Sequence, residues 1–98
     1  KTVTINDKGT GNASVTVDAT AGGVTVLDAK TLRCGATIYN SGTAAMRCAP
    51  TTVTVTSTVG HLMPAGATIM LGAEAQQAWK CIRTTGSSTT AEVAEATP

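Results

Sequence analysis

Four side chains of this 98-residue chain belong to types that commonly bind metal ions: Cys34, Cys48, Cys81 and His61. Structural zinc sites usually hold their cysteines in close pairs, two to four residues apart. None of these three cysteines has another cysteine within that distance. The spacing therefore predicts no metal site.

Catalysis would need ionisable groups that converge in one pocket. His61 is the only histidine, so any Ser or Cys nucleophile would have to use it as its base, and no Gly-x-Ser-x-Gly motif is present. The carboxylates are scattered near expected turns and strand ends, without an obvious acid and base pair: Asp7, Asp18, Asp28, Glu74, Glu92 and Glu95. The sequence predicts a protein that is not an enzyme and has no cofactor.

Composition narrows the range of partners. Charged residues make up 13% of the chain and the net charge is +1, too little positive charge for a nucleic-acid partner. Aromatic residues make up 2%, which disfavours a carbohydrate-binding platform. No apolar run approaches the roughly 18 residues of a membrane span, so no membrane partner is expected either. The chain begins at Lys1, which leaves extracellular maturation open.

The elements that must carry these residues are expected to be β-strands. Apolar residues alternate with polar ones in several segments, a pattern typical of strands with one buried face: Val3/Ile5, Val15/Val17, Val24/Val26, Ala36/Ile38, Val53/Val55 and Ile69/Leu71. Gly and Asn separate these segments, and only residues 73–78 suggest a helical turn. We expect an all-β fold, a single β-sandwich or jelly-roll-like domain of about eight short antiparallel strands over residues 1–93, with a flexible tail at 94–98.

One hairpin can be predicted in detail. If its loop is Asn40-Ser41-Gly42 with Gly42 in the left-handed conformation, Cys34 lies directly opposite Cys48. The pairing places apolar residues on one face of the hairpin: Cys34, Ala36, Ile38, Ala44, Met46 and Cys48. Two states of the cysteines follow. The odd number favours free thiols in the core, and the register permits a Cys34–Cys48 disulfide.

Three stretches share a pattern with a known group of proteins. Residues 32–43 end in Asn-Ser-Gly-Thr, residues 64–71 form a Pro-Ala-Gly turn into a strand, and residues 79–93 contain a Gly-Ser-rich hairpin. This order resembles the small β-domains of tailed-bacteriophage virions, such as capsid decoration (cement) proteins, head fibres and tail-fibre modules. The resemblance implies a structural protein on the outer surface of the virion, often a trimer.

The first functional hypothesis is therefore a capsid decoration protein that binds the major capsid protein or other virion proteins and stabilises the head lattice. The alternative is an extracellular filament or pilus subunit that assembles by β-strand exchange, suggested by the Lys1 start and the Thr/Val-rich segment 51–58. Both are homo-oligomers. On a small Ala/Val-rich domain the largest apolar groups are the expected contacts: Tyr39, Met63, Met70 and Trp79.

Overall fold

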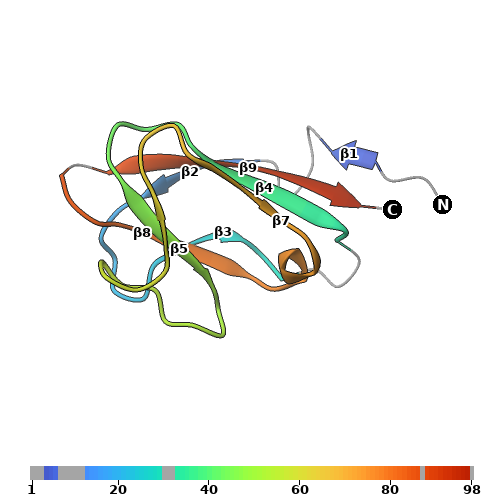
Figure 1. The fold of residues 1–98 in the computed structure, drawn as a ribbon, viewed down its shortest axis with the longest axis horizontal. Coiled ribbons are helices and arrows are strands. Elements are labelled where there is room, and N and C mark those ends of the chain that lie inside the picture. The colour runs from blue at the N-terminus through green and yellow to red at the C-terminus, as the bar shows by residue number, and fades with distance from the viewer. Residues whose placement is uncertain (1–3, 7–12, 30–32, 87, 98) are drawn as a thin grey trace.

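The structure is a computed structural model that describes residues 4–6, 13–29, 33–86 and 88–97. These residues form nine strands in two antiparallel sheets that pack face to face, and one short 3-10 helix, η1 (Ala73–Gln76) (Figure 1). The predicted all-β sandwich is confirmed, as is the helical turn after residue 73. No helix in the described ranges is long and apolar enough to cross a membrane.

The first sheet, sheet A, contains five strands: β1 (Thr4–Asn6), β2 (Ala13–Val17), β4 (Gly35–Asn40), β7 (Thr68–Leu71) and β9 (Thr89–Thr97). Its order is β1-β9-β4-β7, and β2 pairs with β9 on the same side as β1. The long strand β9 therefore carries β2 along its first half and β1 at its end. At the opposite margin, β7 is an edge strand with β4 as its ladder partner.

The second sheet, sheet B, has the order β3-β8-β5-β6. Its strands are β3 (Val24–Leu27), β8 (Trp79–Arg83), β5 (Met46–Pro50) and β6 (His61–Met63). Strand β6 is short and pairs with the first half of β5. The turn after β6 carries the chain across to β7 in sheet A, so the two edge strands diverge from this turn.

The core lies between the sheets and is built mainly from small and medium side chains around one large ring, that of Trp79. Burying one Leu or Ile side chain contributes roughly 1.5–3 kcal/mol. Inward residues of both sheets and Ala75 of η1 make up this cluster: Val17, Val26, Leu27, Ala36, Ile38, Met46, Cys48, Met63, Leu71, Ala75, Trp79, Cys81, Ala91 and Val93.

The predicted hairpin between residues 34 and 48 is wrong, because the chain crosses from sheet A to sheet B between β4 and β5. The two strands face each other across the core and pair with other strands. Gly42 is not in the left-handed conformation. It is required for space instead, because a Cβ there would lie 2.9 Å from the Cα of Thr89 and 2.8 Å from the backbone nitrogen of Thr90.

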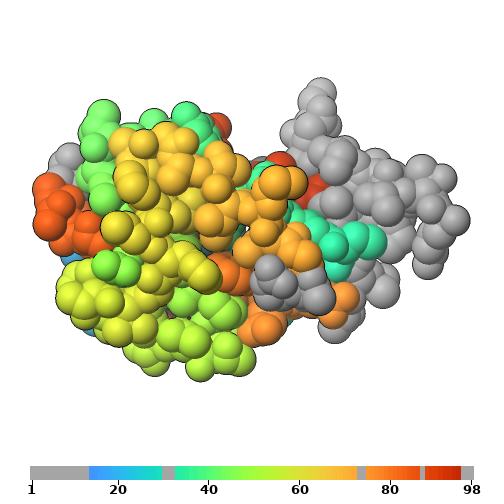
Figure 2. Space-filling model, viewed as in Figure 1, coloured from blue at the N-terminus to red at the C-terminus, as the bar shows by residue number. Residues whose placement is uncertain are grey.

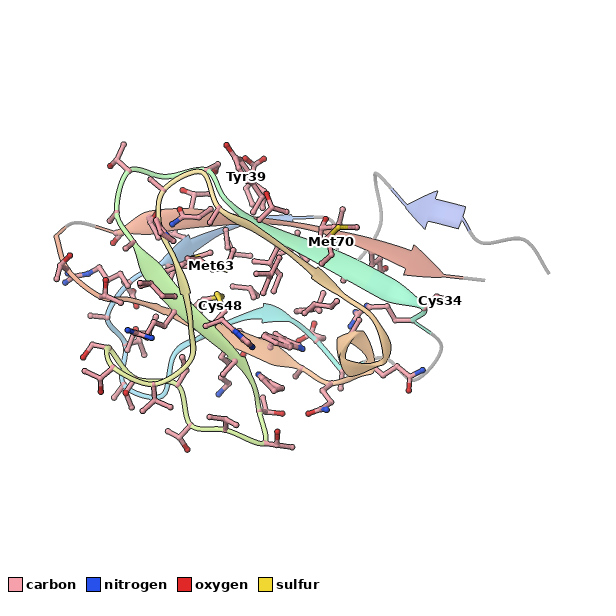
Figure 3. All side chains as sticks on the ribbon, viewed as in Figure 1. Cys34, Tyr39, Cys48, Met63 and Met70 are labelled. Carbon is pink, nitrogen blue, oxygen red and sulfur yellow. A yellow bond between two sulfur atoms is a disulfide. The ribbon has the colours of Figure 1, made fainter. Side chains whose placement is uncertain are left out.

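The cysteines follow from this topology. Strand β5 pairs with β8 so that Cys48 lies opposite Cys81, and the two form a disulfide with their Cα atoms 4.1 Å apart. Cys34 precedes β4, is exposed, and lies at the far end of that strand from Cys48 (Figure 3). The predicted Cys34–Cys48 bridge and the expectation of three free thiols are both wrong, because the partner of Cys48 comes from a strand distant in sequence.

Two further expectations fail. The Thr-rich segment 51–58 forms turns rather than a strand, with Val55 buried and Val53 exposed. Residues 94–97, expected in a flexible tail, belong to β9, where Glu95 pairs in register with both Ala36 and Asn6. Pairing on both sides gives these residues backbone partners that a free tail would not have. Val3 and Pro98 lie outside the described residues.

Candidate interaction surface

The outward face of sheet A carries the two large apolar side chains that are most relevant to assembly. Met70 is 82% exposed and Tyr39 is 40% exposed. The register places Thr37 between Met70 and Ala94, and Tyr39 in the next row of the same face. Figure 3 shows Tyr39 and Met70 on the side of sheet A away from sheet B, whereas Met63 lies between the sheets. We call this set, Thr37, Tyr39, Met70 and Ala94, the outer face of sheet A.

A shallow hollow of about 270 Å³ adjoins Met70 on this face. Small residues form part of its wall, and larger side chains complete it: the lining residues are Gly35, Ala36, Thr37, Met70, Leu71, Ala94 and Glu95. On such a face the protruding side chain can insert into a pocket of a partner, and the space above the small residues can accept a side chain of the partner. This arrangement suits binding to another protein surface.

A second concave feature follows the free edge of β7. It is a groove of about 450 Å³ lined mainly by apolar side chains: Pro50, His61, Ile69, Met70, Leu71 and Trp79. The groove opens where β6 and β7 diverge. Figure 2 shows the yellow and gold atoms of β6, β7 and their turn over the middle of this face, with a hollow beside β7.

An aromatic pair closes one side of the groove. The imidazole of His61 stacks on the indole of Trp79, with ring centroids 6.0 Å apart and planes inclined by 22°. His61 is exposed, whereas Trp79 is 2% exposed. The sequence drew attention to His61 only as a metal-ligand type and as the base that a Ser or Cys nucleophile would need. In the structure it covers the core tryptophan at the sheet margin.

The two surfaces are supported by the pairing of β4 with β9, which is fixed at one end by a buried ion pair. The Nε of Arg33 donates to Oε2 of Glu95 at 2.8 Å, and both side chains are buried. The Arg33 Nη1 also donates to the backbone oxygens of Asp28 (2.7 Å) and Ala75 (2.6 Å). Arg33 therefore ties β9 to the residues after β3 and to η1.

At the other end, the buried Asn40 side chain forms a neutral network. Its Nδ2 donates to the backbone oxygens of Ala44 (2.8 Å) and Met63 (2.9 Å). Its Oδ1 accepts from the backbone N–H of Gly42 (3.1 Å) and the hydroxyl of Thr89 (2.6 Å). Two donors and two acceptor positions are thus satisfied, the full capacity of an amide side chain.

Away from both surfaces, the turn after β2 holds a carboxyl group with a shifted pKa. The pKa of the Asp18 carboxyl is lowered, chiefly because it accepts hydrogen bonds from the hydroxyl and backbone N–H of Thr20. This pair lies in the turn after β2. Within the described residues, no group of three or more His, Cys, Asp or Glu side chains is arranged to hold a metal ion.

The structure separates the four predicted contact residues. Tyr39 and Met70 share the outer face of sheet A. Met63 is 0% exposed in the core, so its prediction as a contact is wrong for the folded subunit. Trp79 fills the core and reaches the surface only as part of the groove. All four residues were predicted as contacts because their side chains are large. Size alone does not show whether a large apolar side chain fills the core or lies on the surface.

Sequence reasoning missed the buried pair of Arg33 and Glu95. Glu95 was placed in a flexible tail, and no local pattern joins it to Arg33. Comparison with known proteins adds no assignment: no family model, curated protein or solved structure matches the chain.

Proposed function

We propose that this chain is a non-enzymatic structural subunit that binds neighbouring protein subunits through the outer face of sheet A. The observation that supports this proposal is the 82% exposure of Met70, which lies beside Tyr39 and beside a hollow whose lining includes Gly35 and Ala94. Removing a Met side chain of this kind from water on binding is favourable, and the flat face needs no rearrangement to meet a partner.

In the first form of the proposal, the assembly is a tailed-phage virion. The chain is then a capsid decoration protein on the outer surface of the head, where it binds the major capsid protein or other virion proteins and adds contacts between capsomers. The resemblance of residues 32–43, 64–71 and 79–93 to such domains supports this form, and a trimer is the oligomer that the resemblance favours.

In the second form, the chain is a subunit of an extracellular filament. The disulfide between Cys48 and Cys81 suits this form. Disulfides are rare in the cytosol and persist in oxidising environments, which include the bacterial periplasm, cell surfaces and virion surfaces. A subunit that folds after export would form this bridge during folding.

Capsid binding tests the first form. Purified protein is added to capsids that lack it, and bound protein is measured after sedimentation. We expect Met70→Ser and Tyr39→Ser to reduce binding at least tenfold. Leu62→Ser is the matched control, because Leu62 is 53% exposed but belongs to sheet B. Equal binding by all three variants would contradict a role for the outer face of sheet A.

Folding in different compartments tests the second form. The chain is produced in the bacterial cytosol and, with an added leader, in the periplasm, and the fraction with a Cys48–Cys81 bridge is measured by mass spectrometry. A filament subunit is expected to reach full yield and to polymerise only when exported. Equal yield and assembly of the reduced cytosolic protein would contradict the second form.

A further inference from the structure

Among the described residues, β7 has no ladder partner on the edge away from β4, and this edge lies beside an apolar groove. The backbone N–H of Asn40 donates to the oxygen of Ala67 at 2.9 Å, which sets the alternation along the β4–β7 ladder. Hydrogen-bonded and non-hydrogen-bonded positions alternate in an antiparallel pair. Ile69 and Leu71 therefore bond to β4, whereas Thr68 and Met70 direct their N–H and C=O groups towards the free edge.

A strand added to this edge would also cover the groove. The groove lies beside Ile69 and Leu71, with Pro50, His61 and Trp79 on its other side. Side chains of an extended strand alternate between its two faces. Apolar residues at every second position would enter the groove, and the intervening residues would lie level with the side chains of Thr68 and Met70. Strand addition of this kind supplies affinity through main-chain hydrogen bonds and specificity through the alternate side chains.

The N-terminus of the chain has the required pattern. Its first residues are Lys-Thr-Val-Thr-Ile-Asn, with Val3 and Ile5 at alternate positions between threonines. Part of this segment is β1, which pairs with the last three residues of β9. Figure 1 shows β1 beyond the end of sheet B, beside the last residues of β9.

Residues 7–12 join β1 to β2 and can span up to ~20 Å when extended. We propose that the N-terminal segment of one copy, residues 2–6, adds as a strand to the β7 edge of a second copy. Val3 and Ile5 then enter the groove beside Trp79. The inference rests on the proposed assembly role and names the self-association that it uses.

Sedimentation equilibrium of the full-length protein over a range of concentrations tests whether the β7 edge mediates self-association. The wild-type protein is expected to self-associate. Thr68→Pro removes an outward N–H that the β4 ladder does not use, and proline is tolerated at such edge positions. It should weaken association at least tenfold. Thr68→Val is the matched control, because it keeps the N–H and should associate like the wild type.

The donor strand is tested by a second matched pair. Ile5→Asp places a carboxylate at a position proposed to enter the groove and should also weaken association at least tenfold. Thr10→Asp makes the same change in charge after the strand and should have little effect. This pair leaves β7 intact, so it decides the proposal even where Thr68→Pro fails to fold, which thermal unfolding would reveal.

Each outcome bears on the proposal. Association that both Thr68→Pro and Ile5→Asp weaken supports it, whether the species is a reciprocal dimer or a longer head-to-tail chain. A wild-type monomer at all concentrations would overturn it, as would association that Ile5→Asp leaves unchanged. Such failures leave the proposed function intact, because that function is tested by Met70 and Tyr39 variants on the outer face of sheet A.

Discussion

The two ends of the β4–β9 pair are held by different chemistry. One end has the Arg33–Glu95 ion pair, and the other has the Asn40 amide with the Thr89 hydroxyl. Both sets are buried and both also bind backbone oxygens of other elements. The charged end ties β9 to η1 and to the residues after β3, whereas the neutral end ties it to the crossing before β5 and to the end of β6.

The two ends differ in the group that stays buried when one partner is removed: a charge at the Arg33–Glu95 end and a neutral polar group at the Asn40 end. A charge left buried without its counterion costs far more than a neutral group that loses a hydrogen bond. The ion pair as a whole is weaker evidence for stability, because transfer of both charges from water is itself costly. The two ends are therefore expected to differ more in their response to single substitutions than in their net contributions.

Glu95→Gln should have the largest effect, about 3–5 kcal/mol of lost stability, because Arg33 remains buried with a neutral partner. Chemical denaturation gives the free energy of unfolding. Glu92→Gln is the control, since Glu92 is exposed on the same strand. The double variant Arg33→Met/Glu95→Leu should recover much of the loss. A double variant no more stable than the single one would show that the charges themselves stabilise the fold.

Removing the disulfide measures how much the covalent link in sheet B contributes to stability, for comparison with the two polar ends of the β4–β9 pair. Cys48→Ala with Cys81→Ala should lower stability by about 2–4 kcal/mol, because the bridge spans a sequence separation of 33 residues and restricts the unfolded chain. Thiol titration of the denatured, unreduced wild-type protein should find one reactive group. Three reactive groups would contradict the bridge.

Asn40→Ala should cost about 2–3 kcal/mol, less than Glu95→Gln, because it leaves buried neutral groups without their partner. Ser41→Ala, at the exposed neighbouring position, is the control and should be close to neutral. Denaturation of both variants measures the difference. A loss at Asn40 that exceeds the loss at Glu95 would reverse the comparison of the two ends.

Asp18→Asn should cause the smallest loss of stability, because the hydrogen bonds of Asp18 with Thr20 are exposed to solvent. Its pKa is lowered in the folded state, so its contribution is present above the unfolded pKa and is lost as the pH falls through the folded value. Asp18→Asn should therefore be slightly less stable than the wild type at neutral pH and should match it in strong acid. A large loss of stability in Asp18→Asn at neutral pH would show that burial does not explain why Glu95→Gln is expected to cost more than a change at an exposed carboxylate.

Alternation of apolar residues was sufficient to predict the fold class and much of the core. Of the six residues expected on one apolar face, Ala36, Ile38, Met46 and Cys48 are buried, whereas Ala44 is half-buried and Cys34 is exposed. The same alternation produced the wrong hairpin. In a sandwich, successive strands can pair within one sheet or face each other across the core, and their inward residues alternate identically in both cases.

The candidate site was predicted in part. Side-chain size alone led to Tyr39 and Met70, which the structure places on one exposed face. The groove could not be predicted, because it depends on where β6 and β7 diverge and on the contact of His61 with Trp79. These residues come from separate segments, and no local pattern relates them.

Short strands of small apolar residues, and the inward side of many of those strands, could be predicted from the alternation of residue types. This property is local, because strand geometry directs neighbouring side chains to opposite faces. Which strands are neighbours is not local and became known only from the folded chain. The pairs Cys48–Cys81 and Arg33–Glu95 depend on the path of the chain between the two layers. Each pair joins residues that are far apart in sequence, and no local pattern predicts their contact.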